Sequence, residues 1–297
     1  MTGAPDGMQA CAYGLIGAGI GTSLSPALHM EEGRHHGLDL SYMLIDTARP
    51  GTPDELGGLL RDAEAQGLAG LNITHPYKQR VIPELDELSP LARVIGAVNT
   101  VVFRDGRRIG HNTDASGFAR SFRRGLPGAA TRRVVQFGAG GAGAAVAHAQ
   151  LEAGTGHVAI VDPDPSRSAA LVRALRKAFG DERADAVDPD GLPASLTAAD
   201  GVVNASPVGM LSHPGTPVAV ELLRDDQWVA DVVYMPAETR LLSEAAARGL
   251  RTLGGTGMCV FQAAGAFELI TGRTPDTERM LRHLSRLLAQ REAATPA

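Results

Sequence analysis

Short apolar runs alternate with longer amphipathic segments along most of the chain. The runs are rich in Val, Ile and Leu, which is typical of buried strands, and they cover residues 12–17, 41–45, 70–74, 100–103, 134–137, 157–161, 201–204 and 227–234. Segments with apolar residues at helical spacing follow many of them, at residues 25–36, 53–66, 114–124, 241–248, 260–271 and 278–291. This alternation predicts an α/β protein with mostly parallel sheets.

A hairpin signal interrupts the alternation in the first half of the chain. Asp105 and Gly106 separate the run that ends at Phe103 from the short segment Arg108–His111. Asp-Gly is a preferred pair for a two-residue hairpin turn, so the flanking segments are predicted to pair as antiparallel strands. Together with the preceding β-α-β-α-β order, this predicts a first α/β domain, which we place at residues 11–128.

A glycine turn opens the second half. The run Val134–Phe137 leads into Gly138, Gly140 and Gly143, which have the G-x-G-x-x-G spacing of a dinucleotide-binding turn. In such a turn the three glycines permit, in order, a sharp bend, close approach of a pyrophosphate and close packing of the next helix. A glycine-rich core loop is the alternative reading. The strand before the turn and the strand His157–Val161 after it favour a Rossmann domain, at residues 129–257.

Asp162 predicts which dinucleotide binds. It ends the strand after the turn, 162 − 138 = 24 residues beyond Gly138, where a carboxylate accepts hydrogen bonds from the ribose hydroxyls of NAD. The same carboxylate would repel the 2′-phosphate of NADP. Arg167 is the nearest positive group that follows. The sequence therefore predicts NAD as the preferred cofactor, with NADP possible.

Composition and charge exclude several other classes. The 297 residues are 44% hydrophobic and 21% charged, which suits two globular domains. The net charge of −5, without a basic block, argues against a nucleic-acid partner. Cys11 and Cys259 lack metal-ligand spacing, so no metal is expected. Without a signal peptide or a long apolar tract, we expect a cytoplasmic protein with no membrane partner.

Candidate chemistry lies near the predicted strand ends, where parallel sheets bind ligands. Thr74 and Lys78 follow the run at residues 70–74, and Asn99 precedes the next run. Ser23 and Ser25 stand before a helix that begins at about residue 26. They either cap this helix, with Ser25 as the capping residue, or offer two hydroxyls to a carboxylate. The bland interpretations of Lys78 and Asn99 are a surface charge and a turn residue.

Several motifs together resemble the shikimate/quinate dehydrogenase family. They occur in the family's order over nearly the whole chain, and they begin at Ser23, Asn72, Gly96, Asn112, Gly138, Asn204, Asp231 and Gly257. The resemblance is nearest to the NAD-preferring quinate/shikimate branch, because Asp162 is present and the basic cluster of the biosynthetic branch is missing. Ser25 stands where quinate-active members have Thr, so the residues leave both acids open.

The resemblance implies a role for each matching residue. Lys78 and Asp114 would form the catalytic pair beside the hydroxyl that is oxidised, with the lysine taking the proton while hydride passes to the nicotinamide. A small cyclohexane or cyclohexene carboxylic acid would be bound by Ser23, Ser25, Thr74, Asn99, Tyr234 and Gln262. The dinucleotide would be bound by Gly138, Ala139, Gly140, Gly141, Ala142, Gly143, Asp162, Arg167, Asn204, Ser206, Pro207, Gly255 and Met258.

Other interpretations remain open on the sequence alone. Asp114 reads equally as an acid at a helix start. The alternatives to an NAD-dependent quinate/shikimate dehydrogenase are an NADP-dependent biosynthetic shikimate dehydrogenase and a paralogue for a modified, for example aminated, acid. A non-catalytic NAD-binding regulator is a third alternative. The protein is expected to be a monomer or a homodimer, with carboxyl-terminal helices at residues 258–292 that return to the first domain.

Overall fold

The computed structural model describes residues 9–53 and 55–294, which form two compact units. One unit contains the described residues up to Thr113 and those from Gln262 onward, and the other is Asp114–Phe261. This division places helix α5 (Asp114–Gly125) in the second unit, whereas the boundaries expected from the sequence, 128/129 and 257/258, place it in the first. That residues 11–128, 129–257 and 258–292 act as separate domains remains a prediction.

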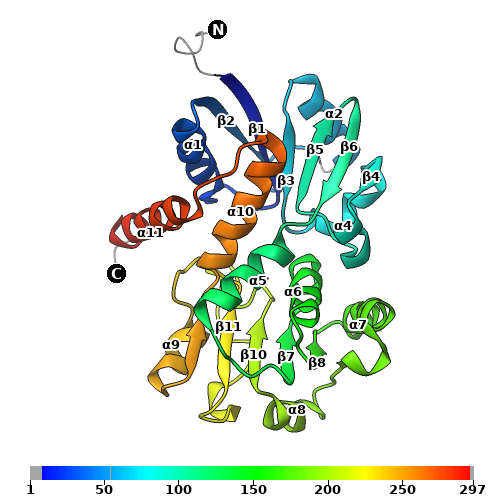
Figure 1. Cartoon of the computed structure of the whole chain (residues 1–297), viewed down its shortest axis with the longest axis vertical. Helices are drawn as coiled ribbons and strands as arrows, with labels where there is room; N and C mark the ends of the chain where they lie inside the picture. Colours follow the sequence, from blue (N-terminus) through cyan, green and yellow to red (C-terminus); the bar gives the residue numbers. More distant parts are fainter. Residues whose placement is uncertain (1–8, 54, 295–297) are drawn as a thin grey trace. The chain divides into compact units, whose positions relative to one another are not determined.

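A six-stranded mixed sheet forms the centre of the first unit (Figure 1). Its strand order is β2-β1-β3-β5-β6-β4, with β1 parallel to both neighbours and β5 antiparallel to both of its own. The strands are β1 (Gln9–Gly17), β2 (Leu38–Asp46), β3 (Gly70–Ile73), β4 (Glu87–Leu88), β5 (Thr100–Arg104) and β6 (Arg107–His111). Asp105 and Gly106 form the predicted hairpin turn, with φ angles of 53° and 72°, because a type I′ turn needs positive φ at both positions.

Helices from both ends of the chain complete the first unit. They are α1 (Ser25–His35), α2 (Leu56–Ala65), α3 (Tyr77–Arg80), α4 (Pro90–Ile95), the part of α10 (Thr256–Thr271) from Gln262 onward, and α11 (Thr277–Ala294), with a 3₁₀ turn η1 (Ile82–Glu84). Phe267 and Ile270 of α10 pack with Tyr13, Leu38 and Leu40 in one buried cluster, so this part of the orange helix lies beside the blue strand β1 in Figure 1.

The last helix packs on the first unit, as the sequence predicted. Arg279 of α11 forms a 2.6 Å ion pair with Glu32 of α1, whose side chain is almost fully buried. The guanidinium and a backbone N–H from Asp276 hold the pKa of Glu32 below its ordinary value, although burial, the largest single influence, raises it. A buried carboxylate that lost this partner would be left uncompensated, so the pair fixes where α11 docks.

An all-parallel sheet forms the centre of the second unit, as a Rossmann domain requires. The strand order is β12-β11-β10-β7-β8-β9. The strands are β7 (Arg133–Phe137), β8 (His157–Val161), β9 (Ala184–Ala186), β10 (Gly201–Asn204), β11 (Trp228–Asp231) and β12 (Arg251–Leu253). The helices are α5, α6 (Gly141–Glu152), α7 (Pro165–Phe179), α8 (Leu192–Ala198), α9 (Arg240–Ala247) and the start of α10, with 3₁₀ turns η2 (Asp181–Arg183) and η3 (Val220–Leu222).

Three local predictions were wrong. Ser25 does not cap helix α1; it is the first helical residue, and Leu24 occupies the capping position without a side-chain bond. The strand predicted to run through Tyr234 ends at Asp231, because the Asp231 side chain accepts the backbone N–H of Val233 and bends the chain there. The helical segment predicted at residues 260–271 begins earlier, because α10 already starts at Thr256. Across the described ranges, none of the helices is long and apolar enough to cross a membrane.

Candidate functional site

Asn99 is the centre of a buried polar cluster in the first unit. The backbone N–H of Thr113 donates to Asn99 Oδ1 at 2.8 Å. Since this N–H can only donate, the contact fixes which end of the carboxamide is the oxygen. Asn99 Nδ2 therefore donates to the Thr113 hydroxyl at 2.8 Å and to Gln262 Oε1 at 3.3 Å. The structure thus brings together two of the predicted ligands of the acid, Asn99 and Gln262.

A second group of polar residues supports this cluster from the sheet. Asn72 Nδ2 donates to the Thr100 hydroxyl at 3.2 Å, and that hydroxyl donates to Asn99 Oδ1 at 3.2 Å. Tyr42 donates from its hydroxyl to Asn72 Oδ1 at 2.9 Å. Asn72, Asn99 and Thr100 are buried, so these bonds act in a low-dielectric environment and restrict the carboxamide to one orientation.

Thr74 and Lys78 lie just beyond the carboxyl end of β3. Thr74 donates its N–H to Ile16 O at 2.9 Å, and Val98 donates to Lys78 O at 2.7 Å. The short helix α3 that carries Lys78 is anchored by Tyr77, which is 2% exposed and donates from its hydroxyl to Thr47 Oγ1 at 2.8 Å. The lysine is half-buried, so its position is set by the sheet edge rather than by a flexible surface loop.

Asp46 holds the loop that leads to the two predicted carboxylate-binding serines. Asp46 Oδ1 accepts the backbone N–H of Gly19 at 2.8 Å and of Ala48 at 3.0 Å. Burial, the largest single influence, raises the pKa of Asp46, but these backbone donors outweigh it and keep the pKa below its ordinary value. Ser23 Oγ accepts the N–H of Ser25 at 3.2 Å. Ser23 therefore forms a local turn with the first residue of α1, while Leu24 remains the capping residue.

In the second unit, the glycine turn has the geometry that its spacing predicted. Gly138 has φ of 103°, and an added Cβ would come within 2.7 Å of Ala205 O. A Cβ at Gly143 would overlap Gly138 O. A Cβ at Gly140 would have, apart from its chain neighbours, none of the described atoms within 4 Å. Helix α6 begins at Gly141 with Gly140 as its cap, so the open side of the turn exposes a helix amino end suited to phosphate.

Asp162 lies next to this turn and is already hydrogen-bonded to it. Asp162 Oδ2 accepts the N–H of Ala139 at 2.8 Å, and Oδ1 accepts the N–H of Asp164 at 3.0 Å. Each oxygen retains a second lone pair for a ribose hydroxyl. Arg167 pairs with Asp164 at 3.5 Å rather than with Asp162, and both side chains of that pair are exposed. These residues fit the adenosine ribose of a dinucleotide.

Asp231 supports the candidate site, although the sequence alone did not predict this role. It is 2% exposed, and its carboxylate accepts from Asn204 Nδ2 at 2.9 Å, Val233 N at 3.0 Å and Thr239 Oγ1 at 2.7 Å. Burial raises its pKa to about 6 in spite of these three donors. Because Asn204 begins the loop with Ser206 and Val233 precedes Tyr234, one carboxylate fastens two predicted ligand-binding segments.

The remaining predicted cofactor residues border the same strand ends. Asn204 Oδ1 accepts from Ser206 Oγ at 2.6 Å, and Pro207 follows on the exposed side of that loop. Gly255 is buried, and an added Cβ would overlap Val232 O. Met258 is 7% exposed in the first turns of α10, whereas Asp114 is the buried first residue of α5.

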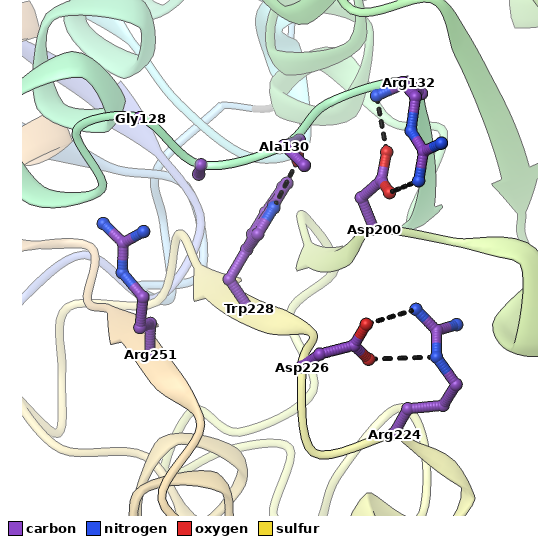
Figure 2. A pocket seen from close by; sticks show the side chains of 9 residues that line it. Gly128, Ala130, Arg132, Asp200, Arg224, Asp226, Trp228 and Arg251 are labelled. Atoms are coloured by element: carbon purple, nitrogen blue, oxygen red, sulfur yellow. Dashed lines mark hydrogen bonds and ion pairs between the residues drawn. The ribbon is translucent and has the colours of Figure 1, made fainter.

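A pocket of about 190 Å³ lies at the opposite edge of this sheet (Figure 2). It is lined by residues before or at the starts of strands, including Arg132, Asp200, Trp228 and Arg251. Arg132 pairs with Asp200 at 3.0 Å, and the Trp228 indole donates to Ala130 O at 2.8 Å. Among the described residues, none of the predicted ligands lines it. The pocket therefore lies at the amino ends of the strands, whereas the glycine turn lies at their carboxyl ends.

Comparison with known proteins decides the family. A family model described as the shikimate dehydrogenase substrate binding domain matches residues 15–101, and one described as the shikimate 5′-dehydrogenase C-terminal domain matches residues 255–284. A shikimate dehydrogenase (NADP(+)) from Streptomyces avermitilis is 60% identical over 275 residues, which cover 92% of this chain and 94% of that protein. The chain belongs to the shikimate/quinate dehydrogenase family. The predicted family, fold class and enzyme class, an oxidoreductase acting on CH–OH groups, are confirmed.

Relatives of the NAD type are similar over comparable lengths. A quinate/shikimate dehydrogenase (NAD(+)) from Corynebacterium efficiens is 50% identical over 269 residues, which cover 90% of this chain and 95% of that protein. The structure of quinate dehydrogenase from Corynebacterium glutamicum in complex with NAD matches with a TM-score of 0.88 and 48% identity, over 94% of this chain and 99% of that one. Both nicotinamide cofactors therefore occur among the relatives of this shikimate/quinate dehydrogenase.

Proposed function

We propose that this shikimate/quinate dehydrogenase prefers NAD and oxidises a ring hydroxyl of shikimate or quinate, giving the corresponding 3-dehydro acid reversibly. The observation that carries the cofactor preference is Asp162. Its carboxylate is bonded to the glycine turn at Ala139, and the nearest following cation, Arg167, is paired with Asp164. A 2′-phosphate beside Asp162 would be repelled by the carboxylate, and Arg167 is already paired with Asp164.

The proposed roles of the protein groups are those that the resemblance to the family implies. Asn99 and Gln262 offer amide groups to ring hydroxyls, with the serines at 23 and 25 and Tyr234 directed to the acid's carboxylate. Lys78 takes the proton from the hydroxyl that is oxidised, and Asp114 orients the reacting groups. NAD, when bound by the glycine turn and Asp162, accepts the hydride. Positioned proton transfer of this kind contributes roughly 10²–10⁴-fold to a rate.

A second candidate is the NADP-dependent biosynthetic enzyme. It is favoured by the Streptomyces avermitilis relative, which is 60% identical and carries that name. The two candidates differ in the sign of the cofactor preference, so one set of initial rates separates them. We would measure shikimate and quinate oxidation with NAD and with NADP. Higher kcat/KM with NAD for either acid supports the proposal, and higher kcat/KM with NADP overturns it.

A pair of variants tests whether Asp162 sets this preference. Asp162→Asn removes the charge beside the ribose but keeps a carboxamide oxygen that can accept the Ala139 N–H. Glu182→Gln removes an exposed charge elsewhere in the same unit and serves as the control. We expect the NAD-to-NADP ratio of kcat/KM to fall at least 10-fold in the first variant and to change little in the second. An equal fall in both would mean that general charge, rather than the ribose contact, sets the ratio.

A further inference from the structure

Two buried glutamines lie directly beneath the glycine turn of the second unit. Gln136 is fully buried in β7, and Gln150 is 4% exposed in α6. Their neighbours in these elements are apolar, Val135 and Phe137 in the strand and Ala149 and Leu151 in the helix, all of them buried. An amide in such a place is destabilising unless its hydrogen bonds are made, so the partners of these two side chains identify their purpose.

The two amides form a chain of bonds with only one possible direction. Gln136 Nε2 lies 2.9 Å from Gly138 O and 2.9 Å from Gly143 O, and both of these atoms can only accept. Gln136 Oε1 therefore faces away from the turn, where it accepts from Gln150 Nε2 at 2.8 Å. Both N–H bonds of Gln136 are spent on the first and third glycines of the G-x-G-x-x-G sequence.

This arrangement also fixes the peptide that carries the Ala139 N–H. In a trans peptide the C=O and N–H groups point in opposite directions. Gln136 pulls the Gly138 carbonyl toward the interior, so the Ala139 N–H of the same peptide points outward. Asp162 Oδ2 accepts that N–H at 2.8 Å. The peptide is thus held on one side by Gln136 and on the other by the carboxylate that the proposed function assigns to the ribose.

We propose that Gln136, supported by Gln150, is a positioning residue for the dinucleotide: through the Gly138–Ala139 peptide it sets both the shape of the phosphate-binding turn and the place of the Asp162 carboxylate. The inference rests on the proposed function, because it takes Asp162 as the ribose ligand. Gln136 touches neither phosphate nor ribose in this account. It acts only on the groups that do, so its loss should weaken dinucleotide binding and leave the acid's affinity unchanged.

Three variants separate positioning from a merely structural role. Gln136→Met keeps the length of the side chain but leaves the two glycine carbonyls and Gln150 Nε2 without partners. Gln150→Met removes only the support. In the double variant Gln136→Met/Gln150→Met, neither glutamine is left unpaired, so thermal stability should recover relative to Gln136→Met alone. The glycine carbonyls still lack their donor, and NAD affinity should stay low.

The experiment is titration calorimetry of each full-length variant with NAD and with ADP-ribose, together with melting temperatures and the KM for shikimate and quinate. For Gln136→Met we expect Kd for both nucleotides to rise about 10-fold, from two lost hydrogen bonds, with less than a 2-fold change in either KM at saturating NAD. Gln150→Met should raise Kd about 3-fold. It tests the inference even if Gln136→Met does not fold.

Two results would overturn the inference while leaving the proposed function intact. One is a Kd for NAD within 2-fold of wild type in both single variants. The other is a Kd that recovers together with the melting temperature in the double variant, since this would mean that affinity followed stability alone. Failure of the wild-type protein to bind NAD would instead overturn the proposed function, and this inference with it.

Discussion

The polar cluster around Asn99 and the glycine turn at Gly138 keep their shapes by different kinds of contact. In the cluster, side chains hold one another: Asn99 bonds to Thr113 and Gln262. In the turn, the Gln136 side chain holds two carbonyls, but backbone also lies against backbone, so that an added methyl group at Gly143 would overlap Gly138 O. We therefore expect the substrate side to be sensitive mainly to groups that are removed, and the cofactor side also to groups that are added.

The largest expected effect is on the turn. Gly143→Ala forces the backbone of the turn apart, which should lower NAD affinity about 100-fold and also lower the melting temperature, because overpacking of this kind is destabilising by roughly 3 kcal/mol. Gly140→Ala is the matched control: its methyl group enters open space, so only NAD affinity should fall. Calorimetric titration would measure the NAD affinity of both variants, and thermal melts would measure their stability. A Gly143→Ala protein with wild-type NAD affinity would contradict the expected sensitivity of the turn to added groups.

Loss of the lysine should be nearly as severe but of another kind. Lys78→Met keeps the aliphatic stem and removes the ammonium group, so we expect kcat to fall about 100-fold or more, with a smaller change in the KM of the acid and an unchanged Kd for NAD. Arg80→Met, on the exposed side of the same helix, is the control and should keep nearly full turnover. If Lys78→Met changed only KM, the lysine would be a binding residue.

One buried group in each unit should respond to acid, and the two contributions have opposite signs. Burial lowers the pKa of His29 in the first unit to about 3, although Glu32 opposes it, and the His29 ring bonds to the Tyr13 hydroxyl at 2.6 Å. The unfolded chain takes up this proton near pH 6.5 and the folded chain does not, so the histidine makes the folded state less stable as pH falls below 6.5. At pH 5 we expect the free energy of unfolding of this unit to be about 2 kcal/mol lower than at pH 7.

Asp231 in the second unit has the reverse sign. Its folded pKa of about 6 lies above the ordinary value of 3.8, so its carboxylate makes the folded state less stable as pH rises toward 6, and acid relieves this by about 1 kcal/mol between pH 7 and pH 5. Hydrogen exchange at the two pH values would measure each unit separately. His29→Gln should reduce the acid sensitivity of the first unit and leave that of the second unit unchanged. An unchanged acid response of the first unit in this variant would contradict the prediction.

A further, small effect is expected on the polar cluster itself. Thr113→Val keeps the shape of the side chain and the backbone N–H but removes the hydroxyl that accepts from Asn99 Nδ2. The KM for shikimate and quinate should rise about 10-fold from the loss of one buried partner, with Kd for NAD unchanged. Thr113→Ser retains the hydroxyl and should restore KM. If both variants behaved alike, the packing of the Thr113 methyl group, rather than its hydrogen bond, would orient Asn99.

Local signals in the sequence were sufficient for the elements but not for the side-chain partners. Asp105 and Gly106 predicted their hairpin, and the three glycines predicted their turn, because each depends on backbone angles within a few residues. The bond between Asn99 and Gln262 joins residues 163 positions apart, which no local pattern contains. Asp231 begins one of the family motifs, but the sequence does not predict its role. Only its burial beside Asn204 shows which segments it holds. The roles assigned to the site residues stay predictions.

The first unit is interrupted in the sequence by the whole of the second. This affects the order in which the two units can fold during synthesis. A ribosome releases the chain from its amino end, and contiguous segments can fold as they emerge. Residues 9–113 emerge without Phe267 and Ile270, which share a buried cluster with Tyr13 and Leu38. The apolar surface of the nascent first sheet therefore stays uncovered until the last helices are synthesised. By then, all residues of the second unit, 114–261, have already been synthesised. The nucleotide-binding half, although it lies in the middle of the gene product, is the part that can finish folding first.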